Sequence, residues 1–208
     1  MLNKSDFNKS EGLYIVVSAP SGTGKTSILR EMMKMCPNMF FSISYTTRPP
    51  RPGEKDGKDY YFISEETFRE RIAQGEFAEW EENYGALYGT SVRTMKEFLE
   101  KGFDLILDIE SRGAKALKKN YPDGVFVFIL PPSIDELKKR LNRRGGESEQ
   151  IIEKRTKKAL DEIKEMIWYD YIIINDRIDA SVDTLKSIYV AEKSRRERMI
   201  NKLNDLFV

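Results

Sequence analysis

The chain has 208 residues, a length that suits one domain with room for a mobile insertion. Its 35 basic and 34 acidic residues nearly cancel, so no overall field favours a nucleic acid or a membrane surface as a partner, and any anion site must be built locally. The absence of histidine excludes Ser–His and Cys–His nucleophiles and an ordinary zinc site.

Four short apolar runs predict buried strands. They cover residues 13–18, 103–109, 125–130 and 171–174, and they are nearly continuous in Val, Ile and Phe, as is typical of parallel strands covered on both faces. Helical patterns separate or follow them, at residues 26–35, 92–101, 134–143, 148–166 and 182–205. This alternation predicts an α/β fold with a mostly parallel sheet.

Candidate caps lie at the starts of three of these helices. Thr90 or Ser91 precedes the second helix, Ser133 the third and Ser148 the fourth. Gly102 follows the second helix, in the position where a glycine commonly ends one.

Residues 39–89 break the alternation. They contain short strand-like pieces (MFFSIS, YYFIS and FAEWEENY), a loop rich in proline and arginine, and a short helix that opens at Ser64. The pattern predicts an insertion with its own antiparallel sheet, able to move against the main sheet.

The cysteine content and the ends of the chain bear on its compartment. One cysteine, Cys36, allows no internal disulfide and suits a reducing compartment. No run approaches the roughly 20 apolar residues of a membrane span, and residues 1–12 lack the apolar core of a signal peptide. We therefore expect a cytoplasmic protein that contacts no membrane.

Residues 19–26, APSGTGKT, match the phosphate-loop pattern G-x-x-x-x-G-K-[ST] except at the first position, where alanine replaces glycine. A buried strand precedes the stretch and a helix follows it, which is the context that the pattern requires. Alanine fits there if its φ stays negative and no ligand atom needs the volume of its Cβ. The stretch predicts a nucleoside triphosphate site, and the plainer interpretation is a glycine-rich turn. The predicted ATP ligands are Ala19, Pro20, Ser21, Gly22, Thr23, Gly24, Lys25 and Thr26.

The chemistry of these residue types supports the first interpretation. Gly22 and Gly24 allow the backbone N–H groups to turn inward onto phosphate. The start of the following helix adds its positive end. Lys25 can reach the β- and γ-phosphates, and the Thr26 hydroxyl can ligate Mg²⁺, the expected cofactor with ATP.

A second anion site is predicted in the proline-rich loop. Arg48 and Arg51 lie three residues apart in TTRPPRPGE, and both guanidinium groups can bind one phosphate. The prolines reduce the entropy lost in holding them there. A nearby tyrosine hydroxyl can donate to the same phosphate. Taken alone, the loop is equally consistent with a solvated basic surface.

The motifs together resemble the guanylate kinase family of bacterial type. The resemblance runs over residues 12–192 and rests on SAPSGTGKTS, SYTTRPPRPGEKDGKDYYF, EFAEW, YGT, LDIESRG, RGGESE and IIINDR, in this order and spacing. It implies transfer of the γ-phosphoryl group of ATP to GMP, and also to dGMP, within purine nucleotide metabolism. It also implies a P-loop NTPase fold with a five-stranded parallel sheet flanked by helices, an NMP-binding insertion (a small mixed or antiparallel sheet plus a helix) and a helical lid.

The resemblance assigns a role to each part of the chain. The core comprises residues 12–38, 91–134 and 166–192, the GMP-binding insertion 39–90 and the lid about 135–165, between an N-terminal tail (1–11) and a C-terminal helix end (193–208). The implied GMP ligands are Ser44, Arg48, Arg51, Tyr60 and Tyr88 for the phosphate, Glu79 and Thr90 for guanine, and Asp108 and Glu110 nearby. Without the resemblance, Glu79 ranks equally with three neighbouring glutamates, and Asp108 is also consistent with a turn residue.

The implied catalytic residues are all cations: Lys25, Arg48, Arg144 and Arg155. Arg144 and Arg155 match lid arginines, and Arg143 competes with the first of them. Asn175 matches a segment near the adenine, and Asp108 is a second candidate for the metal. Two departures have no assigned effect: Glu110 replaces the family's usual aspartate, and Arg112 an expected glutamine.

Three other functions fit parts of the sequence. One is a P-loop kinase for dTMP or a ribose phosphate. Another is a non-catalytic guanylate-kinase-like module that binds phosphopeptides, although Lys25 and Thr26 are retained. The basic residues 193–198 suggest a nucleic acid, but flanking acidic residues favour a solvated helix face and no nucleic-acid partner. The sequence does not decide between a monomer and a homo-oligomer.

Overall fold

The structure, a computed structural model, describes residues 12–142 and 149–199. Five strands form a parallel sheet in the order β2-β7-β1-β8-β9. These strands are β1 (Tyr14–Ser18), β2 (Met39–Phe41), β7 (Asp104–Asp108), β8 (Val125–Leu130) and β9 (Tyr171–Ile174). All residues of β1 are buried, as the continuous apolar run predicts. The four predicted strands are present, but β9, at the edge of the sheet, is not buried as predicted, because Ile172 and Ile174 are exposed.

β2 is the strand for which the prediction was wrong. The sequence pattern assigns MFFSIS to the sheet of the insertion, but Met39–Phe41 pairs in parallel with β7, Met39 opposite Asp104. Only Met39 is buried, while Phe40 and Phe41 are partly exposed. Three residues with one buried side chain are too short a run to distinguish an edge strand of a large sheet from a strand of a small one.

The chain divides into two compact units, each described by itself. In the described residues, the first unit comprises 12–16 and 38–124, and the second comprises 17–37, 125–142 and 149–199. Among the described residues, no helix is both long enough and apolar enough to cross a membrane.

The first unit contains a small mixed sheet in the order β4-β3-β6-β5. Its strands are β3 (Tyr45–Thr46), β4 (Tyr61–Phe62), β5 (Phe77–Asn83) and β6 (Ala86–Ser91). β3 pairs in parallel with β4, whereas the β3–β6 and β5–β6 pairs are antiparallel. Helix α2 (Glu65–Ala73) begins at the predicted Ser64, whose hydroxyl accepts a hydrogen bond from the Thr67 N–H.

Two further helices belong to the first unit. In α3 (Val92–Glu100) Ser91 is the N-cap, and Gly102 follows the helix with φ +77°. The sequence analysis did not predict α4 (Ser111–Asn120), because its buried side is made mainly of small residues. That side consists of Ser111, Gly113, Ala114 and Leu117, which gives a weak apolar pattern.

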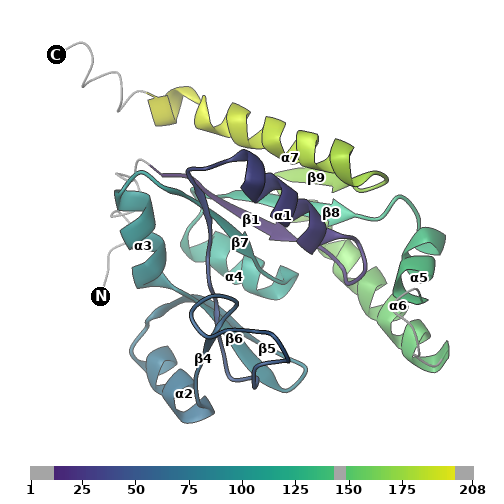
Figure 1. Ribbon diagram of the computed structural model, residues 1–208, viewed down its shortest axis with the longest axis horizontal. Coiled ribbons are helices and arrows are strands. Elements are labelled where there is room, and N and C mark those ends of the chain that lie inside the picture. The colour runs from purple at the N-terminus through teal and green to yellow at the C-terminus, as the bar shows by residue number, and fades with distance from the viewer. Residues whose placement is uncertain (1–11, 143–148, 200–208) are drawn as a thin grey trace. The chain divides into compact units, whose positions relative to one another are not determined.

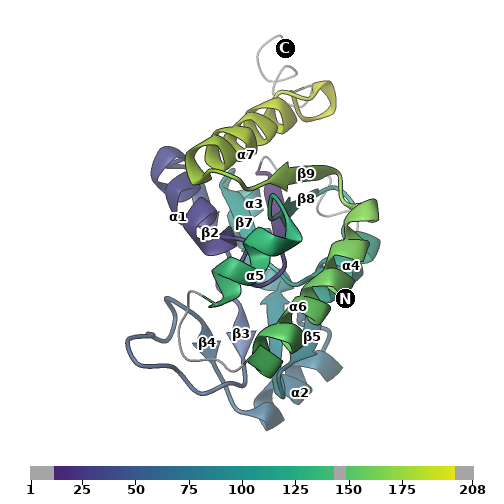
Figure 2. The same ribbon diagram turned by 90° about the vertical axis from the view of Figure 1, so that its right-hand side faces the viewer.

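Besides the helical residues 196–199, the described part of the second unit contains four longer α-helices. These are α1 (Lys25–Met35), α5 (Ile134–Asn142), α6 (Glu149–Lys164) and α7 (Ile178–Lys193), with a 3₁₀ turn at Glu165–Trp168. Helix α7 lies along α1 and β9 (Figure 1). Helices α5 and α6 lie side by side (Figure 2), and Leu137, Leu141 and Ala159 form a buried cluster between them.

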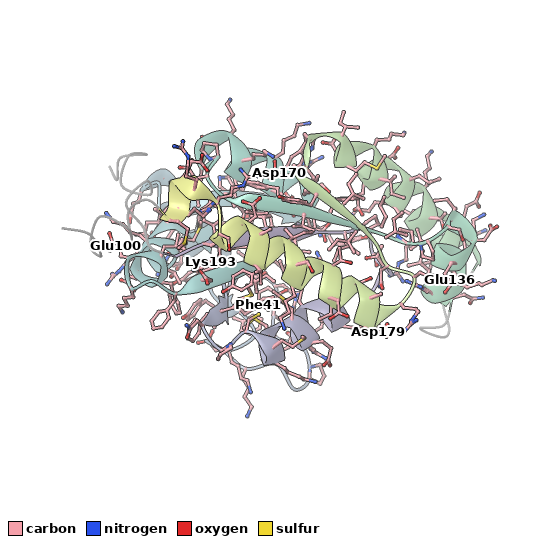
Figure 3. All side chains as sticks on the ribbon, turned by 90° about the horizontal axis from the view of Figure 1, so that it is seen from above. Phe41, Glu100, Glu136, Asp170, Asp179 and Lys193 are labelled. Carbon is pink, nitrogen blue, oxygen red and sulfur yellow. The ribbon has the colours of Figure 1, made fainter. Side chains whose placement is uncertain are left out.

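Helix α7 differs from the predicted helix at 182–205. It begins four residues earlier and ends at Lys193, and Figure 3 shows it from above between the labelled Asp179 and Lys193. The Ser194 hydroxyl donates to the Val190 carbonyl at 2.9 Å, and this local hydrogen bond competes with continuation of the helix. Residues 200–205 of the prediction and the predicted cap Ser148 lie outside the described residues.

Candidate active site

The phosphate loop connects β1 to α1 in the second unit. Gly24 is the residue before the helix, with φ +94°, and Gly22 has φ +89°. The Pro20 carbonyl accepts from both the N–H and the hydroxyl of Thr23, at 3.3 and 2.9 Å. The predicted arrangement of strand, glycine turn and helix is therefore present, and the first-turn amides of α1 begin at Lys25.

Ala19 satisfies the first of its two conditions, a negative φ. Among the described residues, the only non-glycine residue with positive φ is Tyr84. Ala19 is buried at 7% exposure. The alanine at the first position of the pattern is therefore compatible with the loop.

Three predicted side chains lie at the surface of this loop. Lys25 is partly exposed at the first position of α1, and Thr26 beside it is exposed. Arg155, on α6, donates from Nη2 to the Ser21 hydroxyl at 2.7 Å. One of the predicted lid arginines thus reaches the phosphate loop, whereas Arg143 and Arg144 lie outside the described residues.

Asn175 lies behind the loop. It follows β9, is 1% exposed, and donates from Nδ2 to the Thr23 carbonyl at 2.6 Å. Its Oδ1 accepts from the Ser181 hydroxyl at 2.9 Å. Arg140 donates to the carbonyls of Asn175 and Thr23, at 3.1 and 3.4 Å. These contacts place Asn175 against the loop backbone.

In the first unit, Arg48 is held by a carboxylate of its own loop. Its two terminal nitrogens bind the two oxygens of Glu54 at 2.8 and 3.0 Å, and Glu54 also accepts from the Arg51 N–H at 2.7 Å. The hydrogen bond to Arg48 lowers the pKa of Glu54 to about 2. The same pair raises the pKa of Arg48, with a smaller contribution from Tyr88. Glu54 therefore occupies Arg48 with the geometry that a phosphate would use.

Two tyrosines lie beside this guanidinium group. Arg48 stacks over the Tyr60 ring at 5.2 Å, and the Tyr60 and Tyr88 rings meet edge to face at 6.0 Å. Burial, followed by the charge of Asp108, raises the pKa of Tyr60. Four of the predicted GMP-binding residues (Arg48, Tyr60, Tyr88 and Asp108) are thus gathered in one place.

The remaining phosphate candidates, Ser44 and Arg51, lie on either side of Arg48 in the sequence. Ser44 is partly buried just before β3, and its carbonyl accepts from the Tyr61 N–H at 2.9 Å. Arg51 is exposed, and its carbonyl accepts from the Glu54 N–H at 3.0 Å, which closes the turn of the loop.

Glu79 and Thr90 face one another across β5 and β6. The Thr90 hydroxyl donates to Glu79 Oε1 at 2.6 Å, and both side chains are buried. Burial raises the pKa of Glu79 to about 7, against the lowering effect of the Thr90 hydrogen bond, and the charge of Glu81 raises it further. A buried carboxyl group beside a hydroxyl can recognise a pair of N–H donors.

Solvent exposure divides the four glutamates that the sequence could not rank as guanine ligands into two exposed and two buried residues. Glu76 and Glu82 are exposed, whereas Glu79 and Glu81 are buried on one side of β5, at 6% and 8% exposure. Glu81 accepts from the Gly113 N–H at 3.1 Å. The Glu79 carboxylate lies so close to Gly113 that a Cβ at this residue would collide with Oε2.

Asp108 and Glu110 lie where β7 leads into α4. Asp108 ends the strand, partly buried, and Glu110 is the residue before the helix, with its carbonyl accepting from the Ala114 N–H at 2.9 Å. Arg112 is exposed on the first turn of α4. The structure gives no reason for the glutamate at 110 or the arginine at 112.

Five residues of these two sites were not predicted: Glu54, Glu81, Gly113, Arg140 and Ser181. Glu54 lies in the quoted motif, and its spacing from Arg48 and Arg51 could have indicated a partner for them. The other four act through contacts between elements far apart in the sequence. No local pattern marks such contacts.

The phosphate loop fits magnesium carried by a nucleotide. Mg²⁺ keeps several waters and substrate phosphate oxygens and needs only one or two protein oxygens. The exposed Thr26 hydroxyl on the first turn of α1 is such an oxygen. Within the described ranges, no group of three or more Cys, Asp or Glu residues could hold a metal by itself.

Comparisons with known proteins identify the family of the chain. The guanylate kinase family model matches residues 11–192. The guanylate kinase of Syntrophus aciditrophicus is 57% identical over 202 residues, 97% of each chain, and that of Geobacter metallireducens is 50% identical over 199 residues, 96% of this chain and 98% of the relative. The chain belongs to the guanylate kinase family.

A solved structure supports the same assignment. The crystal structure of guanylate kinase from Anaplasma phagocytophilum superposes with a TM-score of 0.75 at 33% identity and covers 92% of each chain. As a guanylate kinase family member the chain is a nucleotide-binding kinase, and the alternatives of a dTMP or ribose phosphate kinase and of a phosphopeptide module are not favoured.

Proposed function

We propose that this chain transfers the γ-phosphoryl group of ATP to GMP, giving ADP and GDP. The donor is bound by the phosphate loop of the second unit and the acceptor by the small sheet of the first. The observation that carries the choice of acceptor is the buried Glu79–Thr90 pair on β5 and β6. The relatives named guanylate kinase, up to 57% identical over 97% of each chain, support it.

The donor site uses backbone amides and cations. Ser21, Gly22 and Gly24 supply backbone N–H groups, the start of α1 supplies its positive end, and Lys25 reaches the β- and γ-phosphates. Arg155 already contacts Ser21 of this loop, which supports its approach to the triphosphate.

Mg²⁺ bound with ATP would neutralise developing charge on the phosphates. In this chain Thr26 would hold it, and Asp108 is a second candidate ligand. Both residues supply the oxygen atoms that this ion prefers.

We place the acceptor phosphate at Arg48 beside Glu54, which holds the two terminal nitrogens of the guanidinium group. Arg48 Nε is buried and has no hydrogen-bond partner among the described residues, so a donor is left for an anion. Arg51 and Ser44 lie on the same loop, and the Tyr60 and Tyr88 hydroxyls lie beside Arg48. Together they make a local cationic site in a chain of nearly zero net charge.

Glu79 and Thr90 read the base. Guanine presents N1–H and an amino group side by side, and one carboxylate accepts from both, while the Thr90 hydroxyl turns its one hydrogen from Glu79 to O6. Adenine would leave the buried carboxylate unpaired, at a cost of about 1–3 kcal/mol or more. dGMP presents the same base and phosphate, so we include it as an acceptor.

Catalysis is by position and charge. Transfer between phosphates needs no covalent nucleophile, so a chain without histidine is suited to it. Lys25, Arg48 and Arg155 neutralise the charge, and Arg144 is the fourth expected cation. Asp108 and Glu110 remain candidates beside GMP.

The proposed division of the chain is core, GMP-binding insertion (39–90) and lid (135–165), with the enzyme placed in the cytoplasm beside its nucleotides.

Turnover with a panel of acceptors tests the function. ATP is combined with GMP, AMP, CMP, UMP or dTMP, and ADP release is followed by a coupled assay. We expect turnover with GMP alone among the five, and none with Lys25→Ala, whose folding is checked by circular dichroism. Faster turnover with any other monophosphate would refute the acceptor assignment.

A further inference from the structure

We propose that Asn175 is a positioning residue of the donor site, which fixes the direction of one peptide group in the phosphate loop. The proposal deepens the donor site and rests on the proposed function. It replaces the expectation from the sequence that Asn175 lies beside the adenine. The Asn175 side chain anchors the Thr23 carbonyl, and the N–H of Gly24 is thereby turned toward the nucleotide phosphates.

The geometry of a peptide bond links the Thr23 carbonyl to the Gly24 N–H. In a planar trans peptide, the carbonyl of one residue and the N–H of the next point in opposite directions. The described residues contain no cis peptide. Anchoring the Thr23 carbonyl on one side therefore directs the Gly24 N–H to the other side. A carbonyl turned toward the phosphates would repel them, so the direction of this peptide group decides whether it attracts or repels the donor.

The anchor itself is short and buried. Asn175 Nδ2 donates to the Thr23 carbonyl at 2.6 Å, and Asn175 is 1% exposed. Arg140 adds a second, longer hydrogen bond to the same carbonyl at 3.4 Å. A Cβ at Gly24 would lie 2.6 Å from Asn175 Nδ2, so the amide packs directly against the loop, and only glycine leaves room for it.

The amide is itself held in the orientation that makes it a donor to the loop. The Ser181 hydroxyl on α7 donates to Asn175 Oδ1 at 2.9 Å, which leaves Nδ2 facing Thr23. The backbone of Asn175 is fixed as well, because its N–H donates to the Leu130 carbonyl at 2.8 Å and its carbonyl accepts from Arg140 at 3.1 Å. β8, α5 and α7 therefore all hold the residue that orients the loop.

Asn175→Asp is the substitution that tests this role. It keeps the size of the side chain and the acceptor for Ser181, but it removes the donor and sets a carboxylate oxygen against the Thr23 carbonyl. Ser181→Ala is the milder variant, since it keeps the amide and frees it to rotate. Asn120→Asp, at the exposed end of α4, is the matched control for the added charge.

The readout must separate phosphate binding from adenine binding. Inorganic tripolyphosphate with Mg²⁺ carries the phosphates without a base, and its affinity is measured by direct titration, which needs no turnover. The ratio of kcat/KM for ATP to that for GTP as donor reports contact with the base. GMP affinity, a property of the first unit, serves as the internal check.

We expect Asn175→Asp to weaken tripolyphosphate and ATP binding by about ten-fold or more and Ser181→Ala by a few-fold, with the ATP-to-GTP ratio and GMP affinity unchanged. Asn120→Asp should match the wild type. Unchanged tripolyphosphate affinity together with an altered ATP-to-GTP ratio would overturn the proposal in favour of an adenine contact. If Asn175→Asp does not fold, as judged by thermal melting, the tripolyphosphate affinity of Ser181→Ala decides. A wild type that binds tripolyphosphate but does not phosphorylate GMP would refute the proposed function while leaving this test valid.

Discussion

Glu79 is a buried acid whose charge state the proposed acceptor controls. Burial raises its pKa to about 7 from an ordinary value of 4.5, so near pH 6 most of the empty protein carries a protonated Glu79. Guanine offers two N–H donors, which require the ionised carboxylate as acceptor. Binding of GMP must therefore release a proton below pH 7.

We predict that GMP affinity falls by about ten-fold between pH 8 and pH 6, because the protonated fraction of Glu79 rises from about a tenth to about nine-tenths. The measurement is isothermal titration of GMP at both pH values. The phosphate of GMP also titrates near pH 6, so the same titration on Glu79→Gln gives the baseline. An equal pH dependence in both proteins would contradict the role assigned to Glu79.

The raised pKa of Glu79 makes GMP affinity rise with pH, but it makes the stability of the folded protein fall with pH. A folded-state pKa above the unfolded one means that the folded protein binds the proton more tightly. The contribution of Glu79 to stability is therefore present below about pH 4.5 and is lost as the pH rises through 7. We expect urea unfolding of Glu79→Gln to lack this part of the pH dependence, and an unchanged profile would indicate that Glu79 is not buried.

Glu54 is predicted to position Arg48 for the acceptor phosphate. In the wild type, both oxygens of the Glu54 carboxylate bind the guanidinium group of Arg48. Glu54→Gln removes the negative charge and one of these acceptors. We expect kcat/KM for GMP to fall roughly ten-fold, since a misplaced catalytic group lowers the rate at least this much. The KM for ATP should stay unchanged. Asp56→Asn, in the same loop but bound to the Phe62 N–H, is the matched control. Improved use of GMP by Glu54→Gln would show instead that Glu54 competes with the phosphate.

At the scale of elements, α4 makes room for the Glu79 carboxylate, which we propose reads the base. Gly113 on α4 leaves space for Glu79 Oε2, and its N–H binds Glu81. We predict that Gly113→Ala displaces Glu79 and lowers kcat/KM for GMP at least ten-fold. IMP lacks the amino group that Glu79 accepts, so the preference for GMP over IMP should shrink as well. The neighbouring buried Ala114→Gly is the control: it loosens the helix but should retain the GMP-to-IMP ratio.

The elements also show how far a sequence predicts structure. Strands β8 and β9 match their predicted limits. A short, continuous apolar run is typical of a strand in a parallel sheet. Helix α4 was missed and β2 was assigned to the wrong sheet. In both cases the deciding information is which distant element packs against the segment: small residues on α4 fit beneath β5, and Met39 pairs with Asp104.

The candidate site shows the same division. Glycines, lysine and arginines of the two anion sites could be placed from their spacing, because backbone turns and paired guanidinium groups require local patterns. Glu79 could be chosen from its neighbours only by resemblance, and the expected place of Asn175 beside the adenine, which rests on the same basis, stays a prediction. Burial and hydrogen-bond direction depend on the folded surroundings.

At the scale of the whole molecule, the proposed reaction uses two units, each with its own proposed anion site. The phosphate loop belongs to the second unit and the Arg48 loop with the Glu79–Thr90 pair to the first. Each site is built from contacts within its own unit, so each substrate should depend on its own unit for binding. Transfer requires both substrates to be bound.

A crossed binding experiment tests this account most directly. Isothermal titration measures ATP and GMP binding separately to the wild type, Lys25→Ala and Arg48→Ala, each confirmed to be folded. We predict that Lys25→Ala loses ATP affinity and keeps GMP affinity within two-fold, and that Arg48→Ala shows the reverse. Loss of GMP binding in Lys25→Ala, or retention of GMP binding in Arg48→Ala, would contradict the assignment of one substrate to each unit.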